Sequence, residues 1–303
     1  MTQLKKRKLK TKIPSGFWIA MAIVSLSSLP YLHEAITTFN SGLQKWVPIL
    51  GIENFLTDNQ GKVLGFSTYR MFLYTLFIFL FTEFSWLAWL FVSKRTSYYY
   101  ALFIPVVMGA YQILIILFNL RKSVANTPEV KLILLLGISL ISVLAYLKKN
   151  RFNLSTSIIW LSIISISTLP YLHDIITLRD ASLRSWVPII GIESFLTNSD
   201  GVGGFWSYRS FVYFLMLHLY AHLGWLGAFI YYGARKKKPR PFLLVPVIIS
   251  LYSVIIILLN WQETGFNKPN IKFYITLALS ALLALNFFFN DKLKIQNKVT
   301  RKI

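Results

Sequence analysis

The chain has 303 residues, of which 55% are hydrophobic, 14% are charged and none is Cys. A soluble domain devotes about 25% of its residues to charge. The composition therefore excludes an ordinary soluble enzyme, a disordered chain and a disulfide-built secreted module, and it indicates a membrane protein.

Long apolar segments recur along the whole chain. A helix that crosses the hydrocarbon core needs about 20 mostly apolar residues. The first segment is too long and too far from the N-terminus for a cleaved signal peptide, so we expect it to be retained. Eight segments are long and apolar enough to span the membrane, at residues 16–38, 71–93, 98–120, 129–148, 156–178, 210–233, 241–261 and 271–289.

The charges indicate how these spans are oriented. The net charge is +21, and 21 of the 32 Lys and Arg residues fall in the two tails and in the loops on the same side. Nine of the eleven acidic residues fall on the opposite side. The positive-inside rule then predicts a multi-pass protein of the cytoplasmic (inner) membrane with both termini cytoplasmic. We expect the basic face to attract anionic lipid headgroups rather than nucleic acid.

The second half of the chain repeats the first. Segments 29–59 and 169–199 share 18 identical residues in 31 positions, including Leu-Pro-Tyr-Leu-His and Trp-Val-Pro-Ile. Weaker matches continue to the end of the eighth span. The fold class predicted is an all-α integral membrane protein with two parallel four-helix repeats and a pseudo-twofold axis along the membrane normal. The repeats cover 16–150 and 151–290, between basic cytoplasmic tails at 1–15 and 291–303.

Each repeat has a long loop on the predicted outer side, between its first and second spans. The part at 46–56 is apolar and interrupted by Pro and Gly. It is too short to span the bilayer. It is either an interfacial anchor or an element that lines a pore or pocket.

No motif of a soluble chemistry is present, so we do not expect an enzyme of that kind. The candidate mid-membrane site begins with Glu83, because a carboxylate at that depth is a functional candidate. Its counterpart in the second repeat is His222, and His218 lies one helical turn away. We expect Glu83 to meet His222 across the pseudo-axis. Three interpretations stay open: a structural pair, a proton or cation site, and a metal or haem site with two His and one carboxylate.

A second candidate site lies at the predicted outer face and occurs twice. Glu53 and Arg70 could form an ion pair that fixes the outer loop. Alternatively the polar residues form a vestibule for a polar or zwitterionic head, or the two histidines bind a haem or metal. The residues are His33, Glu34, Glu53 and Arg70, matched by His173, Asp174, Glu193 and Arg209.

The function hypothesis is a transporter or channel-like protein with the mid-membrane Glu/His site. The alternatives are a membrane-embedded haem, metal or quinone redox enzyme, and a non-catalytic subunit or receptor that assembles with a soluble partner. No cofactor is assigned, and a homo-oligomer or a membrane-complex partner is possible.

Overall fold

A computed structural model describes residues 15–33, 66, 69–148, 151, 153–171, 197–198, 201–202, 208–233, 240–259, 261–262 and 264–300. Helices dominate this part of the chain. The α-helices are α1 (Ser15–Ser27), α5 (Tyr69–Val92), α6 (Phe103–Leu117), α7 (Pro128–Leu147), α8 (Leu154–Ser167), α12 (Tyr208–Gly233), α13 (Leu244–Leu258) and α14 (Pro269–Thr300). Short 3₁₀ helices lie at η1 (Leu120–Lys122), η2 (Val124–Asn126), η3 (Arg240–Leu243) and η4 (Gly265–Asn267), and strands β1 (Thr197–Asn198) and β2 (Gly201–Val202) form a short antiparallel ladder.

The helices lie where the spans were predicted. Within the described ranges, five helices are long and apolar enough to cross a membrane: Met71–Val92, Pro128–Leu147, Leu154–Tyr171, Phe211–Tyr232 and Arg240–Leu258. Two shorter apolar helices, Gly16–Ser27 and Phe103–Leu117, occupy the predicted first and third spans. The long helix α14 covers the eighth. The protein is thus a multi-pass helical membrane protein, while the number eight and the membrane in question stay predictions.

The first and fifth predicted spans are interrupted at the same relative position. Helical structure breaks at Ser28 and at Thr168, two residues before Pro30 and Pro170, and resumes to the end of each described segment. A proline ring removes a backbone donor and clashes with the preceding turn. The two prolines therefore account for a break at the same relative position in both predicted spans.

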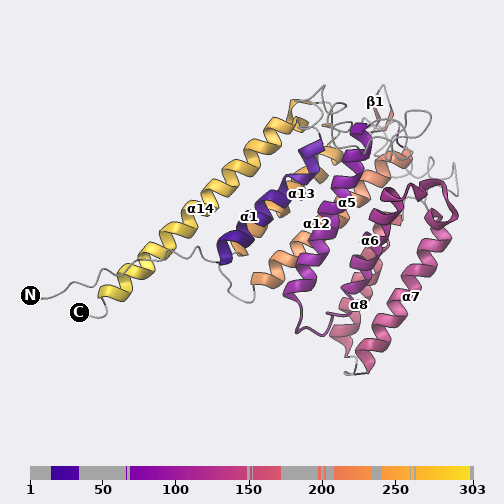
Figure 1. Cartoon of the computed structure of the whole chain (residues 1–303), viewed down its shortest axis with the longest axis horizontal. Coiled ribbons are helices and arrows are strands. Elements are labelled where there is room, and N and C mark those ends of the chain that lie inside the picture. The colour runs from indigo at the N-terminus through magenta and orange to yellow at the C-terminus, as the bar shows by residue number, and fades with distance from the viewer. Residues whose placement is uncertain are drawn as a thin grey trace, which may run out of the picture.

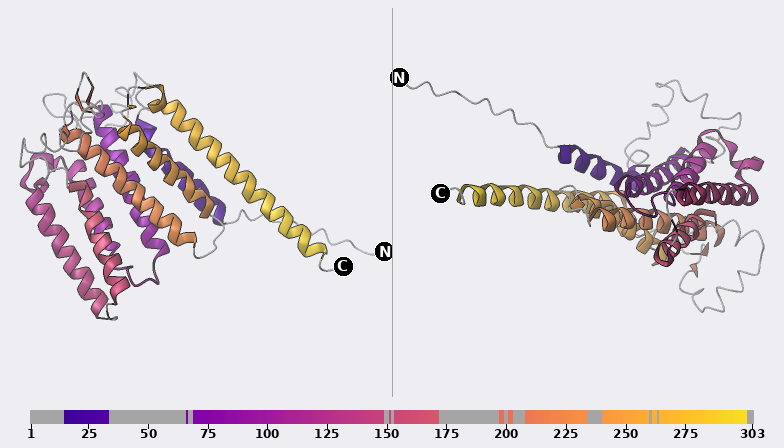
Figure 2. Two further views of the ribbon diagram at one scale, coloured as in Figure 1. Left: turned by 180° about the vertical axis from the view of Figure 1, so that it is seen from behind. Right: turned by 90° about the horizontal axis from the view of Figure 1, so that it is seen from below.

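Figure 1 shows the helices of the bundle tilted in the same direction, with α5 and α12 near its middle. Helices α5 and α12 lie side by side and pack along their length. Helices α6, α7 and α8 lie on one side of this pair, and α1, α13 and α14 on the other, with α7 and α14 at opposite edges (Figure 1). The view from below in Figure 2 shows α14 extending away from the bundle. Helix α8 packs on α6, and α1 packs on α13.

Small residues bring the central pair close together. A β-carbon on Gly224 of α12 would overlap the Ser85 hydroxyl of α5. These helices therefore approach where a glycine permits it. We call this contact the central crossing. Aromatic rings flank it: the Phe81 and Trp225 ring centroids are 5.4 Å apart, and those of Trp86 and Tyr220 are 4.9 Å apart. Pairs at such distances stabilise by about 0.5–1.5 kcal/mol beyond burial.

The outward surface of edge helix α7 is apolar. Ile133 and Ile141 are 69% and 68% exposed, and Leu136, Leu140 and Leu144 accompany them. An apolar face of this size is unstable in water and matches the hydrocarbon core of a bilayer. The lipid bilayer is therefore the natural surroundings of this helix.

Candidate functional site

Glu83 is buried halfway along α5 and faces α6. Only 8% of the residue is exposed. Its carboxyl oxygen Oε2 occupies the space that a β-carbon on Gly109 would fill. Within the described part of the chain no group donates a hydrogen bond to this oxygen. The carboxyl therefore lies in a compact pocket between α5 and α6 that only a glycine leaves open.

His222 faces a different helix. Its Nδ1 lies 2.9 Å from the Ser250 hydroxyl oxygen on α13. That hydroxyl donates its own proton to the carbonyl of Val247, at 2.9 Å. Ser250 therefore accepts from His222, and we assign the proton of the neutral ring to Nδ1.

The predicted meeting of Glu83 and His222 is wrong. Both helices reach the central crossing, but the crossing uses Ser85 and Gly224, each two residues further along. Two residues turn an α-helix by about 200°. The carboxyl and the imidazole consequently point away from the partner helix, each toward the helix that follows it in the chain.

The metal set of Glu83, His218 and His222 is also not formed. The Nδ1 atom of His218 lies 2.8 Å from the carbonyl of Phe214 in the same helix. The three side chains have separate surroundings. Within the described ranges, no three His, Cys, Asp or Glu side chains come together as a metal-ligand group.

The predicted outer site is described only in part. His33 is buried, and its ring centroid lies 4.6 Å from that of Tyr74 on α5. Arg70 and Arg209 lie in the first turns of α5 and α12. The other members, Glu34, Glu53, His173, Asp174 and Glu193, lie outside the described residues, as does the loop segment 46–56. The vestibule and the Glu53–Arg70 ion pair therefore stay predictions.

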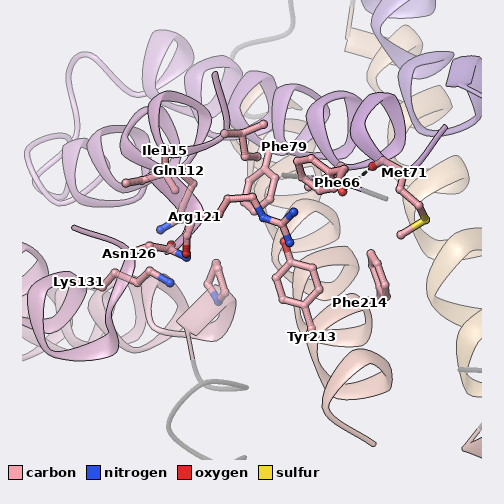
Figure 3. Close-up of a pocket in the computed structure, with 13 residues that line it drawn as sticks. Phe66, Met71, Phe79, Gln112, Ile115, Arg121, Asn126, Lys131, Tyr213 and Phe214 are labelled. Atoms are coloured by element: carbon pink, nitrogen blue, oxygen red, sulfur yellow. Dashed lines mark hydrogen bonds between the residues drawn. The ribbon is translucent and has the colours of Figure 1, made fainter. Parts of the chain in front are cut away.

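A cavity of about 420 Å³ opens near the end of the bundle where α5 begins. We call this end, which is predicted to face outside, the outer end, and the cavity the outer cavity. Helices α5, α6, α7 and α12 contribute to its wall together with η1. Figure 3 shows Arg121 and Lys131 directed into it from η1 and α7.

The outer cavity ends one helical turn from Glu83. Thr75 and Phe79 line it, and Glu83 follows at the same spacing along α5. Gln112 lines it on α6, and Gly109 lies one turn further in. A turn of helix advances about 5.4 Å. Phe79 and Gln112 therefore separate the cavity from the buried carboxyl.

Sequence reasoning missed this cavity. Lys131 was visible as a cation near the start of an apolar span, and Arg121 as a cation just after one. Neither position alone indicates a shared cavity, because their meeting depends on the turn formed by η1 and η2. Asn126 supports that turn by donating an amide hydrogen bond to the carbonyl of Arg121, at 2.8 Å.

No protein-family model, no curated protein and no solved structure matches this chain. The fold and composition define a multi-pass helical membrane protein.

Proposed function

We propose that the protein is a transporter in which the carboxyl of Glu83 takes up and releases a proton during the transport cycle. The observation that carries this proposal is the buried carboxyl itself, whose Oε2 has no hydrogen-bond donor among the described residues. In this proposal Glu83 binds the proton without His222, in contrast to the Glu83–His222 pair expected from the sequence.

The energetics favour a proton-binding role. Insertion scales assign about 2.5–3.5 kcal/mol to an acidic residue at the centre of a spanning helix. Glu83 has neither a cation nor a donor at Oε2, within the described residues, to offset that cost. A purely structural role would be fulfilled by an apolar residue without this cost, so retaining the acid is explained by binding a proton or a cation.

The outer cavity supplies a route to this group. Its innermost lining residues lie about one helical turn from Glu83. Movement of the Phe79 ring and the Gln112 amide would connect the two. Gln112 is itself buried, and its Nε2 has no hydrogen-bond partner within the described residues. A protonated carboxyl could donate to the neighbouring amide, whereas an ionised one would accept from it.

Matched contacts support the proposed organisation as two four-span halves, 16–150 and 151–290. Phe81 and Trp86 of α5 correspond, at an offset of 139, to Tyr220 and Trp225 of α12. The contact of Phe81 with Trp225 then has its counterpart in that of Tyr220 with Trp86. Parallel halves that pack on one central contact could rock against each other, as in transporters built from parallel repeats.

The loops after α6 and α13 support the same correspondence, at an offset of 141. The hydroxyl of Tyr111 donates to the carbonyl of Ala125, and that of Tyr252 donates to the carbonyl of Phe266. The halves also exchange their first helices, because α1 packs on α13 and α8 packs on α6. Neither half would then fold as a separate module.

A proton-flux assay tests the proposal. The purified full chain is reconstituted into liposomes that contain a pH-sensitive dye, and a pH step is imposed across the membrane. We expect flux above that of empty liposomes for the wild type and for Glu129→Gln, an exposed acid at the start of α7. We expect that flux to disappear in Glu83→Gln, which keeps the side-chain shape. Equal flux in all three proteins, or none above empty liposomes, would refute the proposal.

The proposed orientation can be tested by cysteine labelling in intact cells. The chain has no Cys. A single cysteine at exposed Val124 should react with an impermeant maleimide from outside intact cells, and one at exposed Ser97 should not. The reverse labelling would place the termini outside, contrary to the inner-membrane topology.

A further inference from the structure

We infer that two buried tyrosine hydroxyls pass the proton to and from Glu83: that of Tyr171 on the side of the outer cavity and that of Tyr220 on the opposite side. This inference deepens the proposed function by naming the groups that connect the carboxyl to its surroundings. It rests on that function, because a relay matters only if Glu83 exchanges a proton.

Both hydroxyls lie against α6, next to the glycine that leaves room for the carboxyl. The Tyr171 hydroxyl donates to the carbonyl of Met108, at 3.3 Å, and the Tyr220 hydroxyl donates to that of Pro105, at 3.4 Å. Carbonyl oxygens of a helix point toward its C-terminus, because each accepts from the amide four residues later. The C-terminus of α6 lies at the outer end, so the Met108 oxygen is on the outer side of Gly109 and the Pro105 oxygen is on its inner side.

Each hydroxyl is weakly held where it lies. Both hydrogen bonds are longer than the about 2.7–2.8 Å that is typical of an O–H···O bond. Both tyrosines lie close enough to Glu83 to interact with it electrostatically. A hydroxyl hydrogen rotates to suit its acceptor. Turning from the carbonyl toward the carboxyl therefore sacrifices only a weak bond.

Tyr171 also borders the outer cavity. The residue before it, Pro170, lines that cavity. Lys131 is another lining residue, and its Nζ atom lies 5.6 Å from the centroid of the Tyr171 ring. The ring itself is buried. Tyr171 therefore belongs to the layer that separates the cavity from Glu83, together with Phe79.

The second proposed half holds the equivalent hydroxyl elsewhere. Tyr31 corresponds to Tyr171 at an offset of 140, and its hydroxyl donates to Oγ1 of Thr276 on α14, at 2.9 Å. At an offset of 141, Thr276 corresponds to Leu135 of α7, which packs in one buried cluster with Tyr171. A leucine side chain offers no acceptor. The hydroxyl of Tyr171 is consequently directed to α6, beside the buried carboxyl.

The hydroxyl of Tyr220 is not required for packing. Phe81 corresponds to Tyr220 at an offset of 139, and each ring packs on a tryptophan of the opposite helix, Trp225 or Trp86. The central crossing thus accommodates a phenylalanine at this position. Of the two equivalent rings, the one that carries a hydroxyl is the one that contacts α6, next to Glu83.

The proposed transfer leaves each hydroxyl neutral. The Tyr171 hydroxyl passes its proton to the ionised carboxylate of Glu83 as its oxygen takes up a proton from water in the outer cavity. On release, Glu83 passes its proton to the Tyr220 oxygen as that hydroxyl gives its own proton to water on the inner side. One proton crosses, and no bond between heavier atoms forms or breaks.

The test compares Tyr171→Phe and Tyr220→Phe, each of which removes one oxygen and keeps the ring. Tyr31→Phe and Tyr252→Phe are the controls, because they remove hydroxyls of the second half. Proton flux is measured with the full chain in liposomes. Protonation of Glu83 after a pH step is followed separately in a lipid film by infrared spectroscopy. The signal is the carbonyl band of the protonated carboxyl, identified by its loss in Glu83→Gln.

We expect flux to fall by about tenfold or more in Tyr171→Phe and in Tyr220→Phe, because a ring without the hydroxyl transfers no proton. Both controls should keep the wild-type flux. In the infrared experiment Tyr171→Phe should slow the protonation of Glu83 by a similar factor and leave its midpoint pH unchanged. A merely structural role would move the midpoint or unfold the protein. Tyr220→Phe should not slow protonation, because the proton enters from the outer cavity.

Four results would overturn the inference: wild-type flux in either relay variant, equal loss of flux in Tyr31→Phe, slower protonation in Tyr220→Phe but not in Tyr171→Phe, or failure of a relay variant to fold. Wild-type flux in Tyr171→Phe, together with loss of flux in Glu83→Gln, would reject the relay and keep the transporter. Flux retained in Glu83→Gln would reject the proposed function itself.

Discussion

The contact between Glu83 and Gly109 makes a quantitative prediction about stability. Replacing Gly109 by Ala places a methyl group where the carboxyl oxygen Oε2 lies. Overpacking of this kind costs about 1–3 kcal/mol, whereas Gly→Ala inside a helix gains about 1 kcal/mol. We therefore expect Gly109→Ala to lower the free energy of unfolding by about 0–2 kcal/mol.

The cause is isolated by a double-mutant cycle. In the Glu83→Ala background the carboxyl is gone, so Gly109→Ala should no longer overlap it and should stabilise by up to about 1 kcal/mol. The coupling energy between the two positions should then be about 1–3 kcal/mol. Reversible unfolding in mixed micelles, followed by circular dichroism, measures all four proteins.

A matched glycine controls for helix propensity. A β-carbon on Gly137 of α7 would meet nothing within 4 Å. Gly137→Ala should stabilise by up to about 1 kcal/mol in both the wild-type and Glu83→Ala backgrounds. If Gly109→Ala has the same effect in both backgrounds, the carboxyl does not occupy the α5–α6 contact and the placement of the proton site is refuted.

Three further effects are expected in the same unfolding assay. Gly224→Ala at the central crossing should cost about 1–3 kcal/mol, because the methyl overlaps the Ser85 hydroxyl. Ser85→Ala should relieve part of that cost, and no relief would contradict the close approach. His222→Ala removes the hydrogen bond to Ser250 and should lower the free energy of unfolding by roughly 1 kcal/mol. Proton flux in liposomes should stay intact. Loss of flux would restore the imidazole as a proton site. Tyr111→Phe and Tyr252→Phe each remove one hydroxyl donor. They should cost similar amounts, each roughly 1 kcal/mol, and clearly unequal costs would weaken the two-half organisation.

Properties that depend on neighbouring residues could be predicted from the sequence. Apolar length alone located the spans that became α5, α7 and α12, because the bilayer fixes how long a spanning helix must be. The break near Pro30 has a local cause too, because proline lacks a backbone donor. These features need no knowledge of which helix packs against which.

The direction of a side chain around its helix could not be obtained in the same way. Glu83 was placed halfway along its helix, but its partner was wrong because position along a helix does not fix rotation. The position of Gly224 could have indicated which face of α12 approaches α5. This glycine corresponds to Ser85 in the first proposed half, and it marks the face of close approach. Glu83 comes two positions before Ser85, and so lies roughly 200° around the helix from that face.

Comparing the two proposed halves explains how equivalent positions can differ in chemistry. Glu83 and His222 correspond, and so do the positions they face, Gly109 and Ser250. Serine supplies a hydroxyl that pairs with the imidazole, so the polar group of the second half is satisfied within the fold. Glycine supplies only room, and among the described residues no group donates a hydrogen bond to Oε2 of the carboxyl in the first half. The outer cavity adjoins that same half. We therefore expect substitutions beside Glu83 to alter flux and those beside His222 to alter mainly stability.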